Sequence, residues 1–453
     1  MDMLPPEPVT TRASRNHAIE MDYMGTTEAG GSSRGPDSEI PGNTPTQAVE
    51  QTPSVWDPPI NKFRLAAVCL SGLLNGFSDA GAGAVIPYMQ AYYDIGYAVV
   101  SLVFVGQALG FMFAAVFLDS LRTKFGRANV LAIGNISLIL GYVPVAVAAP
   151  YPLIPITFFL VGFGAAINMA LANIFCGGLR NGTFILGLLH GCYGIGGTVS
   201  PLIATALVVA ADTPWNRFYL LPLGISICTL VSSVWVFWHY EQELDPGARE
   251  REMAKTESIL ASLVSTLRMR IVLLGAIFIF AYQGAEVSIS GWVISFLIDV
   301  RDGDPAKVGY VTAGFWAGIT TGRFLLSGPA QRWGEKGFVY GFTAVALAFQ
   351  LLVWFIPNVV GNAIAVAIVG LMLGPIYPCA AAVFMRSMTK RESLRGMVTI
   401  SAFGSLGGAV APFFTGLLAQ VAGTFVLHPI VIFLLVAMLA CWYGIPMISK
   451  REE

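Results

Sequence analysis

The polar stretch YEQELDPGAREREMAKTESILASLVSTLRMR, residues 240–270, decides the organisation of this chain. It contains eleven charged residues and is the longest polar break between the apolar segments that follow residue 60. We expect it to form one or two helices at a membrane surface. Because six long apolar segments lie on each side of it, the break predicts two halves joined by a polar loop.

The apolar segments on both sides are long enough to cross a lipid bilayer, which takes about 20 apolar residues per helix. The predicted spans are 63–89, 97–118, 128–149, 153–178, 183–211, 215–239, 271–298, 306–329, 338–357, 361–386, 396–422 and 426–448. Of the 453 residues, 55% are hydrophobic and 12% are charged, whereas soluble proteins carry about 25% charged residues. This composition excludes an ordinary water-soluble enzyme and predicts a polytopic membrane protein.

The chain before the first span has a different composition. It is rich in Pro, Ser, Thr and acidic residues and has no long apolar run, so we expect a disordered cytosolic tail. It lacks the pattern of a cleavable signal peptide, so the first span is expected to direct membrane insertion. The predicted parts are the tail (1–60), the first six-helix bundle (61–239), the cytosolic central loop (240–270), the second bundle (271–449) and the cytosolic C-terminus (450–453).

Lys and Arg are distributed unevenly between the loops on the two sides of the membrane. The loops on the side of the tail contain 19 of them, while the opposite loops contain only Arg217, Arg301 and Lys307. Basic residues accumulate in cytosolic loops. We therefore expect both termini in the cytosol, in agreement with an even number of spans, and the plasma membrane as the location.

Short motifs recur between the two halves at a nearly constant distance. GGTVSP at 196–201 matches GGAVAP at 407–412, an offset of 211 residues, and KFG at 124–126 matches RWG at 332–334, an offset of 208. We expect both Gly-rich motifs at the interface between the halves, where small residues let helices approach closely. The repeat predicts an all-α membrane protein of twelve transmembrane helices in two pseudo-symmetric six-helix bundles, with a site between them.

Two carboxylates, Asp79 and Glu286, lie deep inside predicted spans at equivalent positions, 207 residues apart. Each is about 15 residues, roughly 22 Å, from the cytosolic end of its span. A charged side chain at this depth costs about 2.5 to 3.5 kcal/mol on insertion scales. Either or both exchange a proton or bind solute; the structural alternative is a hydrogen bond that fixes helix packing. Glu286 is the preferred proton carrier, because Tyr282 and Gln283 share its helix face and Trp292 follows.

Other polar and aromatic residues in the spans are candidates for the same solute and proton pathway. They are Asn168, His190, Tyr193, Tyr282, Gln283, Trp292, Trp316 and Tyr377. For His190 and Asn168, a buried hydrogen bond to a neighbouring group explains the residue equally well. Tyr377 follows Gly374 and Pro375, where a broken helix would widen a cavity.

The predicted cytosolic loop after the second span reads DSLRTKFGR, residues 119–127. A carboxylate at a helix end, followed by basic residues and a tight Gly turn, suits an ion-pair latch that holds one conformation and breaks in the other. The residues of this latch are Asp119, Lys124, Gly126 and Arg127.

These four residues resemble the cytoplasmic signature of the major facilitator superfamily, Gly-x-x-x-Asp-(Arg/Lys)-x-Gly-Arg-(Arg/Lys). The loop departs from the pattern, because four residues separate the aspartate from the lysine and Phe113 or Ala114 stands at the leading Gly. Gly322-Arg323 resembles the second copy. By this resemblance Arg323 pairs across the inner gate; snorkelling towards the cytosolic surface is the alternative. The resemblance covers residues 62–449 and implies two bundles that rock about a central site.

Two segments, YQGAEVSISGW at 282–292 and HGCYGIGG at 190–197, resemble a fungal branch of the superfamily related to sugar and fucose proton symporters. The implied activity is secondary active transport of a small organic molecule, coupled to protons. We prefer efflux of a secondary metabolite, because aromatic residues outnumber amides among the candidates. Proton-coupled sugar uptake is the alternative, since aromatic rings also stack on sugars. A non-transporting membrane receptor or scaffold is the alternative from another class.

The sequence lacks the usual motifs of a membrane enzyme. The motifs His-Glu-x-x-His, Gly-x-Ser-x-Gly and Gly-x-x-x-x-Gly-Lys-(Ser/Thr) are absent. The sequence therefore lacks the usual residues of a zinc-dependent hydrolase, a serine hydrolase or an ATPase. The six cysteines lie in apolar segments without zinc-binding spacing, and no basic stripe points to nucleic acid. We expect no enzyme activity, metal, cofactor or nucleic-acid partner. The expected partners are a small-molecule solute, protons and the lipid bilayer, with the monomer as the functional unit.

Overall fold

The structure is a computed structural model that describes residues 53–243 and 266–445. These residues form helices and no strand. The first half contains α1 (Asn61–Tyr93), α2 (Tyr97–Val100), α3 (Leu102–Ala146), α4 (Leu153–Gly177), α5 (Gly182–Thr205), η1 (Ala206–Ala210), η2 (Trp215–Tyr219), α6 (Leu220–Phe237) and α7 (Tyr240–Glu243). The second half contains α10 (Arg270–Arg301), α11 (Pro305–Val308), α12 (Val311–Trp333), α13 (Glu335–Phe355), α14 (Val359–Leu373), α15 (Ile376–Arg386), α16 (Lys390–Ala422), η3 (Thr424–Val426) and α17 (Leu427–Gly444). The predicted tail up to residue 52, most of the central loop and the predicted C-terminus lie outside the described residues.

The helix α3 consists of two limbs that meet at Gly126. This glycine has φ 78° and ψ 165°, a left-handed conformation that side chains with a Cβ rarely adopt. A Cβ placed on Gly106 in the first limb would touch Pro155 on α4, and one placed on Gly141 in the second limb would touch Thr157. Both limbs therefore pack against the same turn of α4, and the chain reverses at the predicted Gly turn.

Ten helical segments of the described residues are long and apolar enough to cross a membrane. One of them, Tyr97–Ala146, contains both limbs of α3 and covers two predicted spans. The predicted span 306–329 falls on α12, which is 23 residues long. This helix is not among the segments apolar enough to cross a membrane. The multi-pass membrane fold is confirmed. The predicted count of twelve is not confirmed in full, because the described residues give ten such segments, or eleven when α3 is divided at Gly126.

The outer surface of the bundle is apolar, as a lipid environment requires. Large side chains such as Leu140, Val231 and Phe433 are exposed on helices from both halves. A soluble monomer rarely exposes large contiguous apolar patches. The surface therefore agrees with helices that are surrounded by lipid.

The two halves repeat the same helix contacts. In the first half α1 packs on α5, and in the second half α10 packs on α16. A Cβ on Gly196 would lie 2.1 Å from the carbonyl oxygen of Leu73, and a Cβ on Gly407 would lie 2.1 Å from that of Phe280. Because these distances are equal at equivalent positions, the repeated GlyGly motif has one physical cause: it lets the two helices of each half touch along their backbones. These two contacts lie within the halves rather than between them.

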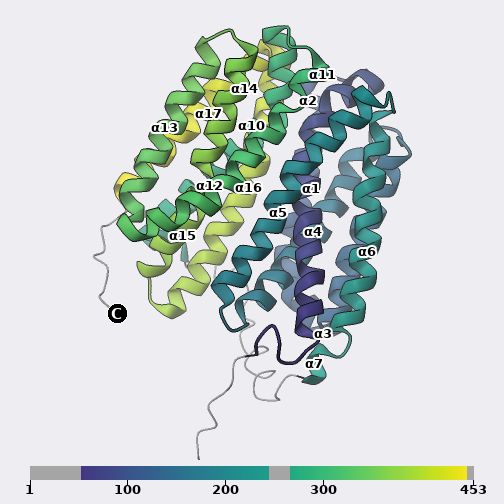
Figure 1. Ribbon diagram of the computed structural model, residues 1–453, viewed down its shortest axis with the longest axis vertical. Helices are drawn as coiled ribbons and strands as arrows, with labels where there is room; N and C mark the ends of the chain where they lie inside the picture. The colour runs from purple at the N-terminus through teal and green to yellow at the C-terminus, as the bar shows by residue number, and fades with distance from the viewer. Residues whose placement is uncertain (1–52, 244–265, 446–453) are drawn as a thin grey trace, which may run out of the picture. The chain divides into compact units, whose positions relative to one another are not determined.

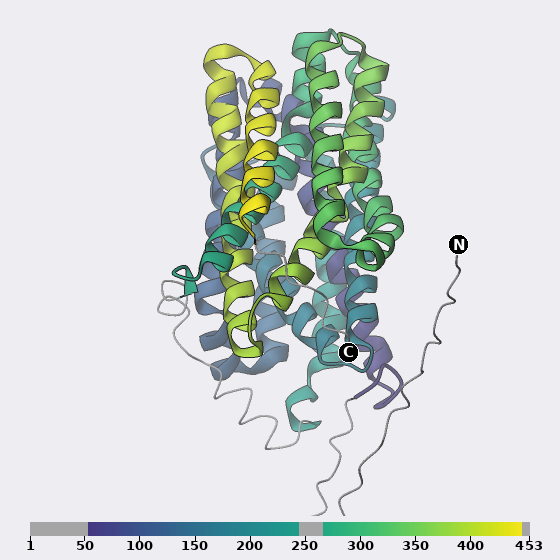
Figure 2. The same ribbon diagram turned by 90° about the vertical axis from the view of Figure 1, so that its left-hand side faces the viewer.

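Helices α1–α6 lie on one side of Figure 1 and α10 and α12–α17 on the other, while the short α11 lies near α2. Figure 2 looks onto the second group, which the chain enters through α10. The halves touch at the helix ends near Tyr97, where the Tyr97 hydroxyl donates to Asp299 Oδ2 at 2.6 Å and Gln420 Oε1 accepts from the Ala98 amide at 3.4 Å. We call this the Tyr97 end, and the end that carries Arg64 and Arg127 the basic end.

Candidate functional site

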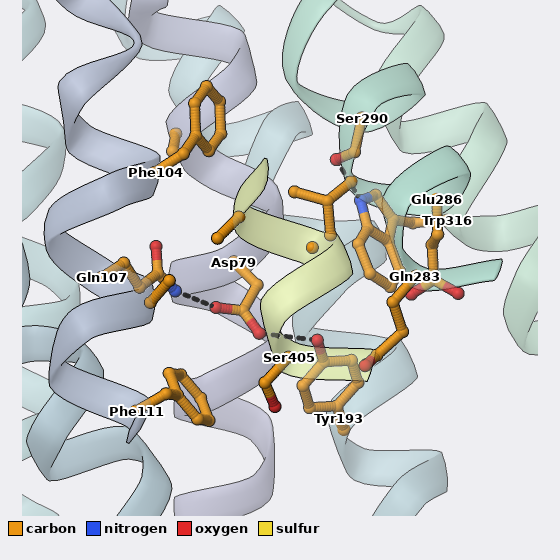
Figure 3. A pocket seen from close by; sticks show the side chains of 15 residues that line it. Asp79, Phe104, Gln107, Phe111, Tyr193, Gln283, Glu286, Ser290, Trp316 and Ser405 are labelled. Carbon is orange, nitrogen blue, oxygen red and sulfur yellow. Dashed lines mark hydrogen bonds between the residues drawn. The ribbon is translucent and has the colours of Figure 1, made fainter. Parts of the chain in front are cut away.

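A cavity of about 120 Å³ lies between the two halves, near the middle of α1 and α10. Its wall comes from α1, α3 and α5 of the first half and from α10, α12 and α16 of the second. Figure 3 shows its polar and aromatic side chains pointing towards one another from these helices. Pockets for drug-sized ligands measure roughly 300 to 1,000 Å³. The cavity is smaller than these, and its size suits a small solute.

Asp79 lies in the wall on α1 and is held by two neutral donors. Gln107 Nε2 on α3 donates to Asp79 Oδ1 at 2.7 Å, and the Tyr193 hydroxyl on α5 donates to Asp79 Oδ2 at 2.7 Å (Figure 3). Both partners belong to the same half as Asp79. The carboxyl group is therefore oriented towards the cavity by three helices of the first half.

Glu286 lies in the wall on α10 and has a different environment. Its side chain is 7% exposed, and Oε2 lies 3.9 Å from Nη2 of Arg323 on α12. This distance permits charge attraction but is too long for a hydrogen bond. Glu286 Oε2 makes no hydrogen bond of standard geometry among the described residues, and neither does the Tyr282 hydroxyl, which lies close to both Glu286 and Arg323. A buried polar atom without a partner is costly, so Glu286 Oε2, on a residue of the cavity wall, is available to a hydroxyl-bearing ligand.

Trp316 on α12 forms the aromatic part of the wall. Its ring centre lies 5.9 Å from that of Tyr193, with the ring planes at 62°. The indole Nε1 donates to Ser290 Oγ on α10 at 2.8 Å (Figure 3). Phe104 and Phe111 on α3 face the same cavity. Aromatic rings thus stand beside the carboxylates of both halves.

The structure brings five of the predicted pathway residues to this cavity together. They are Asp79, Tyr193, Gln283, Glu286 and Trp316. The fully buried Trp292 lies towards the Tyr97 end, where Nε1 donates to the Pro412 carbonyl at 2.9 Å and the ring packs against Tyr97 and Phe104.

Four other predicted residues are not among those that line the cavity, namely Tyr282, Asn168, Tyr377 and His190. Asn168 pairs with Asn135 inside the first half, with N···O distances of 3.1 and 3.3 Å. Tyr377 lies just after the break between α14 and α15, as predicted, with its ring 6.1 Å from Tyr282. His190 is half-buried on α5, within electrostatic reach of Arg323.

Sequence reasoning missed the contribution of α3 and α16 to the site. Phe104, Gln107 and Phe111 line the cavity from α3, and Ser405 does so from α16. Gln107 had a usable signal, because it is the one amide in the apolar span 97–118 and has an aromatic residue one turn away on each side. Ser405 lies in a Gly-rich run where no such signal exists.

The latch residues lie at the basic end. Asp119 Oδ1 is 4.0 Å from Nη2 of Arg122, one turn along the same helix. Lys124 Nζ lies over the neighbouring Phe125 ring, and the buried Arg127 stacks on the ring of Tyr240 at 4.3 Å. The contact of Arg127 ties this loop to α7, at the start of the central loop.

Arg323, the fifth gate residue, lies on α12 and pairs with Glu286 in its own half. The neighbouring Phe324 reaches across to the first half, where a Cβ on Gly191 would lie 2.7 Å from its ring. Thr320, one turn earlier, approaches Gly194 in the same way. The Gly-rich part of α5 therefore faces the other half, as predicted, whereas Gly404 and Gly408 face α10.

The chain is similar to a family model and to known sequences. A family model described as Major Facilitator Superfamily matches residues 68–392, more than half of the chain. Bypass of stop codon protein 6 of Saccharomyces cerevisiae is 25% identical over 424 residues, which cover 87% of this chain and 84% of that protein. A glucose/galactose transporter of Brucella abortus is 24% identical over 413 residues, which cover 84% of this chain and 93% of that protein.

Solved structures share the fold at low sequence identity. A D-xylose-proton symporter aligns with a TM-score of 0.65 and 12% identity, over 84% of this chain and 97% of that chain. The E. coli fucose:proton symporter aligns with a TM-score of 0.61 and 16% identity, over 85% of this chain and 99% of that chain. At these identities the likeness concerns the arrangement of the helices alone.

Proposed function

The chain belongs to the Major Facilitator Superfamily, and from this premise we propose that it is a proton-coupled transporter of a monosaccharide or a similarly small hydroxylated solute. Membership makes it a membrane transporter and not an enzyme. The observation that carries the proposal is the small cavity between the halves, with a carboxylate from each half in its wall. A solute bound there contacts both halves at once, as alternating exposure to the two sides requires.

The chemistry of the wall supports a hydroxylated solute. Glu286 and Gln283 line the cavity, where Glu286 Oε2 makes no hydrogen bond of standard geometry among the described residues and Gln283 adds an amide. Such groups bind sugar hydroxyls, while the Trp316 ring suits the apolar face of a sugar. The names of two kinds of relative, a glucose/galactose transporter and proton symporters of xylose and fucose, support the same class.

The contacts of the two carboxylates support Asp79 as the group that exchanges the proton. The partners of Asp79 are neutral, so uptake of a proton breaks no ion pair there. Protonation of Glu286 would instead remove the negative charge that faces Arg323. Asp79 is therefore the proposed proton carrier, in place of Glu286, which the sequence favoured for that role. Glu286 is proposed to bind the solute.

Export of a partly apolar secondary metabolite is the second candidate. The rings of Phe104 and Phe111, which line the cavity on the side of Asp79, support it. A monosaccharide leaves these rings partly unused, whereas a cyclic metabolite would cover them. The two candidate functions differ in the solute that should bind in the cavity, a monosaccharide or an apolar cyclic metabolite.

Purified full-length protein in vesicles tests both candidates. With an inward proton gradient, we expect accumulation of at least one of D-glucose, D-galactose, D-xylose and L-fucose above equilibrium, and loss of accumulation with a protonophore. Vesicles without protein are the control. If none of the four sugars accumulates or protects the protein against heat, while an apolar cyclic metabolite does, the second candidate replaces the first.

A further inference from the structure

We propose that Ser290 is a positioning residue that holds Trp316 as the solute-facing wall of the cavity. The inference rests on the proposed function, because it concerns the cavity assigned to the solute. Ser290 itself lies in the cavity wall beside Trp316, and the inference goes beyond the proposed function by assigning to Ser290 the task of fixing the indole ring.

The hydrogen bond between the two side chains is buried. Ser290 is 3% exposed and Trp316 is 2% exposed, and indole Nε1 donates to Ser290 Oγ at 2.8 Å. An indole has one hydrogen-bond donor and no acceptor. If the acceptor is removed, the N–H group remains buried without a partner unless the ring turns. Ser290 therefore fixes the orientation of the ring.

The first half packs against both Ser290 and Trp316. A Cβ placed on Gly83 of α1 would lie 2.1 Å from the carbonyl oxygen of Ser290, so the backbone at this serine is in direct contact with α1. A Cβ placed on Gly197 of α5 would lie 3.0 Å from the ring of Trp316. The first half thus packs on the backbone of Ser290 and on the ring of Trp316, and the hydrogen bond joins these two contact points.

The hydrogen bond and these contacts together fix the position of the Trp316 ring when the two halves are packed as in this structure. The ring stands beside Tyr193, whose hydroxyl is committed to Asp79. A ring that turned away from Ser290 would change the shape of the cavity on the side opposite α3. The expected consequence of losing Ser290 Oγ is weaker solute binding, with the transport step itself unaffected.

The chain offers a matched control on the same helix. Ser288 is also fully buried on α10, but its hydroxyl has no hydrogen-bond partner among the described residues. Ser288→Ala removes the same atoms as Ser290→Ala without removing a contact to Trp316. Ser290→Thr keeps a hydroxyl acceptor and provides the conservative comparison.

Equilibrium binding to the purified full-length protein measures the first effect, with whichever of the four sugars binds the wild type most tightly. We expect Ser290→Ala to weaken binding roughly two- to tenfold, the range that one neutral hydrogen bond contributes. Its maximal transport rate in vesicles should stay within about twofold of wild type. Ser288→Ala should bind like the wild type, and Ser290→Thr should lie closer to the wild type than Ser290→Ala. In a Trp316→Phe background, Ser290→Ala should have no further effect, because the donor is already gone.

Tryptophan fluorescence gives a readout that needs no solute. The emission of Trp316 is obtained as the difference between each protein and its Trp316→Phe counterpart. In Ser290→Ala this difference spectrum should shift to the red and become easier to quench with acrylamide. Failure of all four sugars to bind the wild type would refute the proposed function alone. An unchanged difference spectrum, or an undiminished effect of Ser290→Ala in the Trp316→Phe background, would refute the positioning role.

Discussion

Asp79 and Glu286 stand at equivalent positions of a duplicated unit, yet their surroundings have diverged. Asp79 receives hydrogen bonds from Gln107 and Tyr193, whereas Glu286 faces Arg323 across 3.9 Å. A carboxyl group with neutral partners can gain or lose a proton without leaving a cation uncompensated. Protonation of a carboxyl group that faces an arginine would leave that cation uncompensated. The two copies therefore suit different tasks, one for the proton and one for the solute.

Replacement of Asp79 by Asn tests the proton task. Asn is nearly the same size and can still accept a hydrogen bond, but it cannot titrate. We expect solute exchange between the two sides of the vesicle to continue and accumulation driven by a proton gradient to fall to the equilibrium level. Asp212→Asn, which changes an exposed carboxylate outside the helices, should accumulate solute normally. Gradient-driven accumulation close to wild type in Asp79→Asn would exclude this residue as the proton carrier.

Replacement of Glu286 by Gln separates the solute task from the proton task. Gln keeps hydrogen-bonding capacity and shape, so protein yield should survive. Loss of the charge beside Arg323 should weaken solute binding by roughly 1.5 to 3 kcal/mol, the worth of a hydrogen bond to a charged group, or about ten- to 150-fold. Binding assays and gradient-driven uptake measure the two effects separately. If Glu286→Gln binds solute normally but no longer accumulates it, the proton role returns to Glu286.

At the scale of single helices, the repeated GlyGly motif explains why helices in each half can touch. Gly407→Ala places a Cβ 2.1 Å from the carbonyl oxygen of Phe280, a distance that requires α10 and α16 to move apart. The clash is with backbone rather than with a flexible side chain. We therefore expect the free energy of unfolding to fall by about 1 to 3 kcal/mol, the usual range for overpacking. The midpoint of thermal unfolding of the purified protein measures this loss.

Gly224 on α6 provides the control for this substitution. A Cβ there meets nothing within 4 Å, so Gly224→Ala should leave the midpoint unchanged or raise it slightly through the better helix propensity of alanine. Gly196→Ala, at the equivalent position of the first half, should behave like Gly407→Ala. Equal stability of Gly407→Ala and Gly224→Ala would contradict the packing explanation of the repeat.

At the scale of the whole molecule, the charge distribution predicts the orientation in the membrane. Arg180, in the loop between α4 and α5, belongs to the predicted cytosolic side, and the exposed Lys307 on α11 belongs to the opposite side. In intact cells, a membrane-impermeant maleimide should label Lys307→Cys above the background of the native cysteines. Arg180→Cys should be labelled only after permeabilisation. The sequon Asn181-Gly-Thr183 should remain without a glycan in a eukaryotic host. The reverse labelling pattern, or a glycan on Asn181, would overturn the orientation.

Much of the fold followed from the sequence because membrane helices are determined locally. Long apolar runs located the helices, the Gly126 turn located the reversal in α3, and Gly374-Pro375 located the break between α14 and α15. The exception is α12, a more polar helix that packs against α5 and α14. For the site, the same logic identified Asp79 and Glu286, since a charge inside an apolar span stands out without any knowledge of its neighbours.

The sequence by itself thus determined the membrane-spanning helices, the duplication and the two carboxylates, because bilayer thickness and the cost of burying charge act on each segment separately. Only the tertiary structure decided which side chains meet. It placed Gln107 on Asp79, Arg323 beside Glu286 and Ser290 on Trp316, and it kept Asn168 inside one half with Asn135. These pairs join different helices, and the hydrogen-bonded partners are 26 to 33 residues apart in the chain. Their geometry depends on how helices rotate and cross when they pack, and no local pattern of residues encodes that rotation.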